Sequence, residues 1–157
     1  MIDRRRFLVV TGLAVTPLAA LLSACGNKGN WPEGMAEIKW DRDTCVRCNM
    51  VISDRRFAAE MRGGPKSTVF KFDDIGCAVF WLRDKQANYP WMTEADTRLW
   101  VADVNSSGNA VRWLDARTAH YFSKTSPMGY NHGAVALPQA GSMAFPEMRV
   151  HVLAKGK

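Results

Sequence analysis

The segment Asp43–Ser53 carries two cysteines and a methionine within six residues, Cys45, Cys48 and Met50. Two thiols in Cys-x-x-Cys spacing fit four kinds of chemistry: a redox pair, half of a zinc site, a structural disulfide, or a site for a softer metal. Structural zinc usually takes four Cys or His ligands in paired motifs, and the sequence has no second such pair. Thiolate and thioether ligands instead favour monovalent copper.

A second segment, Thr125–Ala134, carries Met128 and His132 four positions apart. A proline and two glycines in the same segment predict a loop and not a helix. Soft ligands in loops would let a metal leave by ligand exchange, whereas a closed four-coordinate cage would retain it. Thr125–Ala134 is therefore the candidate second source of metal ligands.

The N-terminus has the features of a bacterial export signal. Three arginines, Arg4–Arg6, precede an apolar run, Phe7–Leu22, that polar residues, glycine and proline interrupt. That length and those breaks favour an export signal over a spanning helix, and "RRRFL" resembles a twin-arginine signal. The run ends in "LSAC", which resembles the lipobox of bacterial lipoproteins. We expect residues 1–24 to be removed and Cys25 to be acylated, placing the protein at the periplasmic face of a membrane; the choice of membrane and of export route stays open.

Size and charge limit the possible functions of the remaining chain. Removal of 24 of the 157 residues leaves 133, enough for one modest domain. We predict a short polar tether at residues 25–36 and one domain at residues 37–157. The net charge of +6 falls to about +4 with the signal removed. No basic stripe with interleaved aromatic residues is present, which argues against a nucleic-acid partner.

The cysteine count leaves the state of the thiols open. With Cys25 acylated, Cys45, Cys48 and Cys77 remain. An oxidising compartment favours a Cys45–Cys48 disulfide and leaves Cys77 alone. A thiol–disulfide oxidoreductase is the main enzymatic alternative. Such enzymes usually set the pair at a helix N-terminus, which lowers the thiol pKa, and here the strand-like residues 50–53 follow instead.

Apolar periodicity and turn residues predict a mixed order of strands and helices. Strands are expected at residues 37–40, 56–62, 67–72, 98–104, 110–114, 133–138 and 148–154, and helices at 73–84 and 115–122. Asp73 and Asp115 are the expected capping residues of the two helices. His120 is expected to pack within the second helix, and His151 to point outward from the last strand.

A faint internal repeat suggests a duplicated unit. "FDDIGCAVF" (72–80) aligns without a gap on "LDARTAHYF" (114–122). We therefore predict an α+β fold of two related ββαβ units, at about 37–104 and 109–157. The alignment pairs Cys77 with Ala119, which favours a core-packing role for Cys77 because cysteine behaves as a small buried hydrophobe.

Five blocks together carry a resemblance to a known family. They are "CVRCNMVISDRRFAAEM", "FKFDDIGCAVFWL", "LWVADV", "WLDARTAHYF" and "SPMGYNHGAVA", in this order and at this spacing. Over roughly Trp40–Leu137 the chain resembles the NosL family, the copper-binding lipoprotein accessory proteins of nitrous oxide reductase. No single block is specific.

The resemblance implies both a fold and a function. It implies two related ββαβ units with a topology similar to organomercurial lyase. It implies a non-enzymatic Cu(I) metallochaperone that delivers copper to nitrous oxide reductase together with a membrane ABC-type assembly complex.

The resemblance also implies a mixed ligand set. By position, the Cys-x-Met of the family motif falls on Cys48 and Met50, and the "SPMG" methionine is Met128. His132 is the nearest imidazole, and Cys45 is either a ligand or a neighbour. The family commonly has glycine where this chain has Asn49, a residue that also tolerates left-handed backbone.

Overall fold

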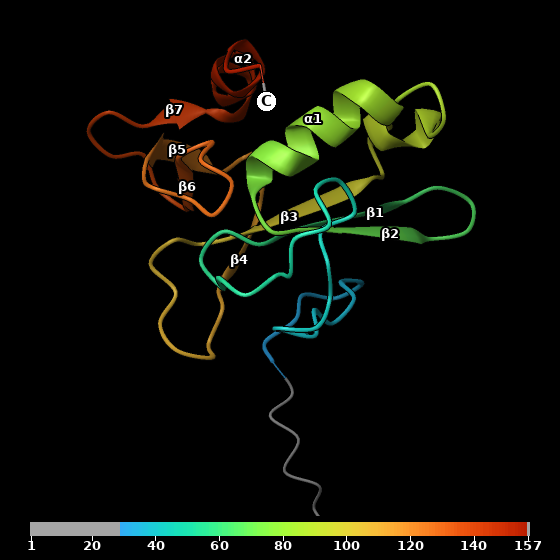
Figure 1. Cartoon of the computed structure of the whole chain (residues 1–157), viewed down its shortest axis with the longest axis horizontal. Coiled ribbons are helices and arrows are strands. Elements are labelled where there is room, and N and C mark those ends of the chain that lie inside the picture. Colours follow the sequence, from blue (N-terminus) through green and yellow to red (C-terminus); the bar gives the residue numbers. More distant parts are fainter. Residues whose placement is uncertain (1–28, 157) are drawn as a thin grey trace, which may run out of the picture.

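The computed structural model describes residues 29–156, so the predictions on the export signal and on acylation of Cys25 lie outside the described residues. The described chain forms two antiparallel sheets and two α-helices, an α+β arrangement (Figure 1). The elements are β1 (Ala59–Gly63), β2 (Thr68–Phe72), α1 (Ile75–Lys85), the 3₁₀ helix η1 (Pro90–Thr93), β3 (Arg98–Ala102), β4 (Trp113–Asp115), β5 (His120–Ser123), β6 (His132–Val135), β7 (Met143–Ala144) and α2 (Phe145–Ala154).

The first sheet has the strand order β2-β1-β3-β4, with antiparallel neighbours throughout. Side chains alternate between its two faces. Met61, which pairs with Phe70 and Leu99, belongs to the main core together with α1. Trp100, opposite Glu60 in the register, belongs to a second, smaller core.

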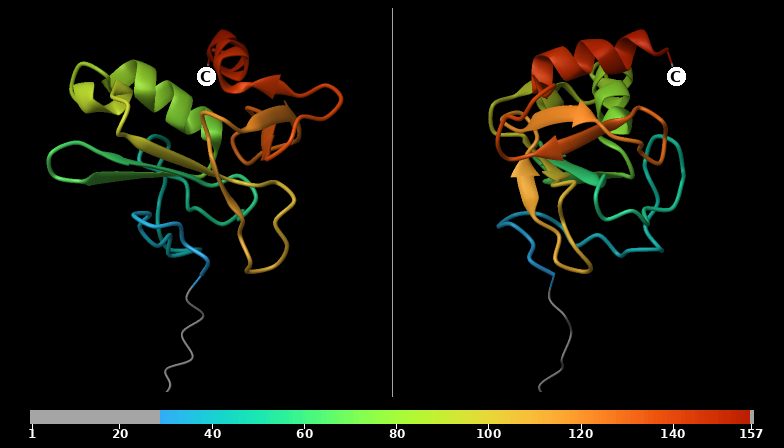
Figure 2. Two further views of the ribbon diagram at one scale, coloured as in Figure 1. Left: turned by 180° about the vertical axis from the view of Figure 1, so that it is seen from behind. Right: turned by 90° about the vertical axis from the view of Figure 1, so that its left-hand side faces the viewer.

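The two faces of this sheet are covered differently. α1 lies over one face, and residues 29–40 of the chain leading into β1 lie over the other, as both Figure 1 and Figure 2 show. The second core joins buried Met35 and Ile38 of that leading segment to Ile52, Ala58 and Trp100. The leading segment therefore acts as an irregular cover, and residues 37–40, predicted as a strand, form none.

The second sheet has the order β6-β5-β7 and packs beside α2. The first predicted unit, β1-β2-α1-β3, is confirmed as ββαβ. The prediction of the same order in the second unit is wrong, because β7 precedes α2 and no strand follows α2 among the described residues. The expected likeness to organomercurial lyase stays a prediction.

The predicted helix at 115–122 is wrong. The Asp115 carboxylate accepts a hydrogen bond from Arg117 N at 2.8 Å, and Thr118 Oγ1 donates to the Asp115 carbonyl at 3.3 Å. These bonds close a turn, after which β5 begins. Tyr121 is fully buried while His120 and Phe122 are half-buried, which is the period of a strand and outweighs the capping signal of Asp115.

The predicted strand at 148–154 is also wrong, since these residues belong to α2. Phe145, Met148 and Val152 are the buried positions of this helix, spaced three and four apart. Pro146 lies in its first turn, where a missing N–H costs nothing. His151 is exposed on α2, as its polar character requires.

Residues 29–36, the described part of the predicted tether, contact the folded domain. Ala36 N donates to Glu60 Oε1 at 2.7 Å, and Arg62 Nη1 donates to the Gly34 carbonyl at 2.5 Å. Trp31 stacks on Trp113 of β4 with ring centroids 5.5 Å apart. Among the described residues, no helix is long and apolar enough to span a bilayer.

Candidate metal centre

The cysteine loop is closed by its own backbone. Cys45 N donates to the Met50 carbonyl at 2.8 Å, and Asn49 N donates to the Cys45 carbonyl at 2.9 Å. Asn49 has φ 61°, so the expectation that asparagine takes a left-handed turn here is confirmed. Val46 N also donates to the Lys71 carbonyl at 2.9 Å, which attaches the loop to β2.

Two adjacent aspartates fill the junction between β2 and α1. Asp74 is the N-cap of α1, and its side chain accepts from Gly76 N at 2.9 Å. Asp73, one residue earlier, points its carboxylate at the cysteine loop and accepts from Cys48 Sγ at 3.3 Å. Cys77 follows in the first turn of α1 and is fully buried.

These elements bring four potential ligand atoms together. The sulfurs of Cys45, Cys48 and Cys77 and a carboxylate oxygen of Asp73 all lie within 4.8 Å of one another. We call these four residues the sulfur cluster. All three cysteines are free thiols. The main core surrounds the cluster, since Cys45 and Cys77 belong to that core and Cys48 packs against it.

Cys45 is the most acidic thiol of the sulfur cluster. A hydrogen bond from the Cys77 thiol lowers the pKa of Cys45 to about 7, and the backbone N–H groups of Cys48 and Asp73 act in the same direction against burial. Near neutral pH, Cys45 is thus in large part a thiolate, the form that binds a metal.

The other two thiols hold their protons. Burial, together with the negative charges of Cys45 and Asp73, raises the pKa of Cys48 to about 12. Hydrogen bonding to Cys45, with burial, raises the pKa of Cys77 well above its usual range. Below pH 12 the metal-free cluster therefore carries one thiolate at most, and any further thiolate ligand must lose a proton as the metal binds.

The loop that carries Met128 is attached to the same junction. Ser126 Oγ donates to Asp74 Oδ2 at 2.5 Å, and Met128 N donates to the same oxygen at 3.4 Å. Met128 is half-buried and packs against the main core. Since Asp73 contacts Cys48 while its neighbour Asp74 contacts Met128, the two predicted ligand loops meet at consecutive residues.

A close contact fixes the far end of this loop. Tyr130 packs so tightly over Gly76 that a Cβ added to Gly76 would lie 2.2 Å from the tyrosine ring. The Tyr130 hydroxyl accepts a hydrogen bond from Arg47 Nη1 at 2.7 Å. Arg47 comes from the cysteine loop, so this hydrogen bond joins the two loops directly.

The two remaining predicted ligands lie differently. Met50 is 56% exposed, with its backbone tied to Cys45 and its thioether at the surface. His132, at the start of β6, is buried, and neither ring nitrogen has a hydrogen-bond partner among the described residues. Its ring lies beside His151 of α2, with centroids 6.5 Å apart. Burial, with the nearby charges of Lys155 and His151, lowers the pKa of His132 to about 4. The nitrogens of His132 are not part of the sulfur cluster.

Sequence reasoning missed two members of the sulfur cluster. Asp73 was expected only as a helix cap, a role that its neighbour Asp74 fills. Cys77 was assigned to core packing, and it is indeed fully buried, but its thiol faces Cys45 and Cys48. The available signal was the spacing of Asp73 and Cys77, four residues apart at the start of a helix.

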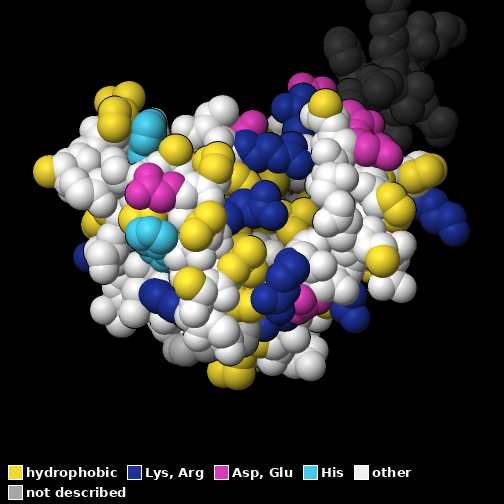
Figure 3. Space-filling model, turned by 90° about the horizontal axis from the view of Figure 1, so that it is seen from above, with side chains coloured by type: hydrophobic (Ala, Val, Ile, Leu, Met, Phe, Trp, Pro, Cys, Tyr) yellow, Lys and Arg dark blue, Asp and Glu magenta, His cyan; other side chains and the backbone are white. Residues whose placement is uncertain are grey.

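Basic side chains gather near the helices. On the face that carries α1 and α2, lysine and arginine side chains form an irregular line with hydrophobic side chains between them (Figure 3). Exposed or half-exposed positions of these helices include Arg83, Lys85 and Arg149, and Lys155 follows α2.

Comparisons with known proteins agree with this fold. No family model matches the chain, and no curated protein matches it. The crystal structure of the copper chaperone NosL from Shewanella denitrificans is similar, with a TM-score of 0.52 and 18% sequence identity, over 78% of this chain and 89% of that chain. The chain therefore has a NosL-like α+β fold.

Proposed function

We propose that this protein is a periplasmic Cu(I) metallochaperone of the NosL family, anchored by lipid on Cys25, that delivers copper for the maturation of nitrous oxide reductase. The observation that carries the proposal is the sulfur cluster, with three thiols and one carboxylate within 4.8 Å of one another. The NosL-like fold and the attachment of the Met128 loop to Asp74 support it.

The donor set suits a soft monovalent ion. Thiolates and thioethers select Cu(I), whereas carboxylates suit harder ions. Cys45 and Cys48 supply the thiolates, and Met128 offers a thioether from a loop whose backbone is hydrogen-bonded to Asp74 at the same junction. Asp73 has a different role, because its carboxylate accepts a hydrogen bond from the Cys48 thiol in the metal-free protein and so orients that sulfur.

Release requires a path for ligand exchange. Met50 is 56% exposed, and its carbonyl is bonded to Cys45 N, so its thioether stands at the outer edge of the cysteine loop. There it can take copper from, or offer copper to, a soft ligand of an acceptor. The basic side chains on the α1 and α2 face favour an acceptor with an acidic surface.

The acceptors are inferred from the family resemblance of the sequence. We propose nitrous oxide reductase and its membrane ABC-type assembly complex as the partners. Acylation of Cys25 would hold the carrier beside that complex, and the export signal would direct it to the periplasmic face of the membrane.

A thiol–disulfide oxidoreductase is the second candidate, because a Cys45 pKa of about 7 is typical of a nucleophilic thiol. The cysteine pair does not open a helix, however, since Thr44 and Val51 form an antiparallel bridge around it. An insulin-reduction assay distinguishes the two functions. Turnover by the wild type that Cys45→Ser abolishes would favour the enzyme.

The direct test is a Cu(I) titration of the reduced protein against a chromophoric chelator. We expect one copper per chain. If Cys45 and Cys48 both ligate, one proton is displaced between pH 7 and pH 12, where Cys48 is the protonated member of the pair, and two below pH 7. Affinity should then rise about tenfold per pH unit above pH 7 and about a hundredfold per unit below it. A pH-independent affinity would contradict thiolate ligation by this pair.

A further inference from the structure

Three tryptophans form a stacked layer on the face of the first sheet opposite α1. The three ring centroids form a triangle: Trp31 lies 6.2 Å from Trp40 and 5.5 Å from Trp113, and Trp40 and Trp113 are 6.4 Å apart with nearly parallel planes, 10° from one another. The guanidinium of Arg55 lies 5.0 Å over the Trp40 ring. We call Trp31, Trp40, Trp113 and Arg55 the tryptophan layer.

The tryptophan layer is not a closed core. All three indoles are partly exposed, although they pack against the second core. A cavity of about 640 Å³ lies beside them, lined by Trp31, Trp40 and Arg55 and by the β3–β4 loop. Trp31 and Trp40 border this open cavity, and Trp113 stacks against both of them. Packing the domain does not require aromatic rings to border an open cavity of this size, so the layer points to an external apolar partner.

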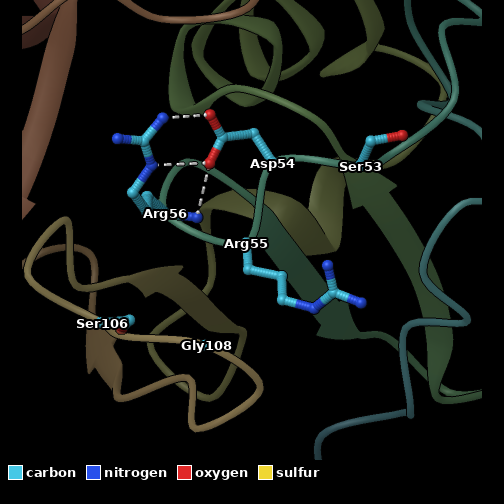
Figure 4. Close-up of a pocket in the computed structure, with 6 residues that line it drawn as sticks. All are labelled: Ser53, Asp54, Arg55, Arg56, Ser106 and Gly108. Carbon is cyan, nitrogen blue, oxygen red and sulfur yellow. Dashed lines mark hydrogen bonds and ion pairs between the residues drawn. The ribbon is translucent and has the colours of Figure 1, made fainter.

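A second hollow extends the same surface. It has a volume of about 470 Å³ and is lined by Arg55, Arg56 and the β3–β4 loop residues Ser106 and Gly108. Figure 4 shows that the two arginines point apart: Arg56 pairs with Asp54, and Arg55 turns away from that pair. Asp54 thus neutralises Arg56, whereas the Arg55 guanidinium lies over the Trp40 ring of the tryptophan layer.

The position of this face in the chain indicates what covers it. Gly29, the first described residue, lines the larger cavity, and the chain enters the domain on this side (Figure 1). Cys25 is four residues earlier in the sequence. Four residues span at most about 14 Å when fully extended, so a lipid on Cys25 would hold Gly29, and with it the edge of the tryptophan layer, within about 14 Å of the lipid anchor.

We infer that the tryptophan layer rests in the headgroup region of the membrane and fixes the orientation of the domain. This inference rests on the proposed lipid anchor. Tryptophan concentrates at membrane–water interfaces because its ring is apolar and its N–H is polar. An arginine whose guanidinium lies over such a ring keeps its charge in the headgroup layer while the rings face the apolar boundary.

The charges around the layer specify the kind of lipid contact. Arg55 Nη2 lies 3.9 Å from Asp41 Oδ2, and Glu37 also lines the cavity. Positive and negative groups are therefore mixed, and attraction to anionic lipid contributes little. The aromatic rings carry the contact, so zwitterionic vesicles should suffice.

The orientation has a consequence for the cargo. The sulfur cluster lies at the N-terminus of α1, on the other side of the sheet from the tryptophan layer. With the layer on the membrane, the cluster and the basic α1 and α2 face point away from the lipid, where a soluble acceptor can reach them.

The test uses the full lipidated chain reconstituted into zwitterionic phosphatidylcholine vesicles, with and without lipid brominated near the headgroup. We expect brominated lipid to quench tryptophan fluorescence of the wild type by tens of per cent. The triple variant W31F/W40F/W113F should lose this quenching. The control W81F, on α1, should keep it. Cu(I) binding is measured on the same samples and reports on the fold of each variant.

Each outcome decides one question. Unquenched wild-type fluorescence with normal copper binding would overturn the inferred membrane contact of the tryptophan layer and leave the proposed function standing. Normal quenching without copper binding would overturn the proposed function and leave the membrane contact of the tryptophan layer standing. Quenching that needs anionic lipid, a Cys25 that mass spectrometry shows to be unacylated, or protection of the indoles by dimerisation in detergent would each overturn the inference. If the triple variant does not bind copper, the three single Trp→Phe variants are measured instead. Each should then lose part of the quenching, and the three losses should together account for the wild-type quenching.

Discussion

The two halves of the domain contain similar elements, but the junctions that lead into their helices differ. The first half, β1 to β4, and the second half, β5 to α2, each hold an antiparallel hairpin and one helix, and the two helices pack on each other. In the first half, two aspartates alone connect β2 to α1. In the second half, β7 and its flanking loop separate β6 from α2, and the N-cap residue Ala144 makes no side-chain hydrogen bond.

This difference shows where the candidate chemistry arises. A strand that passes into a helix within two residues brings a carboxylate, a cap and a side chain of the first helical turn close together. In the first half those groups are Asp73, Asp74 and Cys77, and a loop brings the other two sulfurs to them. In the second half the longer connection disperses the polar groups, and His132 and His151 remain as a pair without a third ligand group around them among the described residues.

The largest expected effect is on copper affinity, which a substitution in the first half should lower and a substitution in the second half should not. Cys48→Ala should lower the Cu(I) affinity at least about 100-fold, since changing a residue that only orients a metal ligand already costs about 10–100-fold. The matched change in the second half, His151→Ala, should leave the affinity within about twofold. Chelator competition at fixed pH measures both. Equal losses in the two variants would mean that the second half also holds the metal.

The halves should also respond to pH with opposite sign. Burial raises the pKa of Glu60, in β1, to about 7, and that of His132, in β6, falls to about 4. Glu60 is protonated in the folded protein, so the stability it contributes is complete below pH 4.5 and is lost as pH rises through 7. His132 is neutral when folded, so the stability it contributes is present above pH 6.5 and is lost as pH falls to 4. Each effect is at most about 3 kcal/mol.

In the wild type, Glu60 and His132 change the free energy of unfolding with pH in opposite directions, and the two changes offset one another between pH 4.5 and 6.5. Glu60→Gln should therefore expose a free energy of unfolding that increases with pH over this window. His132→Gln should expose one that decreases with pH, toward pH 7. Urea unfolding at pH 4.5, 5.5 and 6.5 measures the slopes, and identical pH profiles for wild type and both variants would rule out this pairing.

A smaller effect is expected from the contact that fixes the Met128 loop. Gly76→Ala places a methyl group 2.2 Å from the Tyr130 ring and should lower the free energy of unfolding by about 1–3 kcal/mol. The control Gly108→Ala meets nothing within 4 Å, and only its left-handed backbone costs about 1 kcal/mol. Thermal unfolding compares the two. A smaller loss for Gly76→Ala than for Gly108→Ala would show that Tyr130 moves aside freely.

The smallest effect concerns the missing cap of α2. Ala144→Ser supplies a hydroxyl at the N-cap and should raise the free energy of unfolding by about 0.5–1 kcal/mol. The reciprocal change Asp74→Ala, which removes the cap of α1 and the acceptor of Ser126, should lower it by about 2 kcal/mol. The midpoints of urea unfolding should rise for Ala144→Ser and fall for Asp74→Ala. A destabilising Ala144→Ser would show that the helix end needs no further acceptor.

The sequence predicted the first half better than the second. Alternating apolar residues and the Asp cap were sufficient for β1, β2, α1 and β3, because local signals and tertiary packing agree there. In the second half they conflict. Asp115 looks like a helix cap but closes a turn, and Val150 and Val152 look like strand residues, although Phe145, Met148 and Val152 already had helical spacing.

The candidate site was predicted in part. The cysteine loop and the Met128 loop were identified from residue type, and the structure attaches both to Asp73 and Asp74. Cys77 is buried in the main core as predicted, but its place in the sulfur cluster was missed. The pairing of Cys77 with Ala119 assumed two equivalent helices, and Ala119 precedes a strand instead. No local pattern states which way a helical cysteine faces. That depends on how the cysteine loop packs on β2.

The two neighbouring aspartates also determine where the chain tolerates a change of length. A residue added to the β3–β4 loop at 105–110 meets solvent and leaves both ligand loops in register. A residue added between Asp73 and Asp74 would turn one carboxylate away from its loop, so the thiols and the thioether would separate although every strand pairing survived. Insertions at this junction should thus abolish metal capture in a protein that still folds.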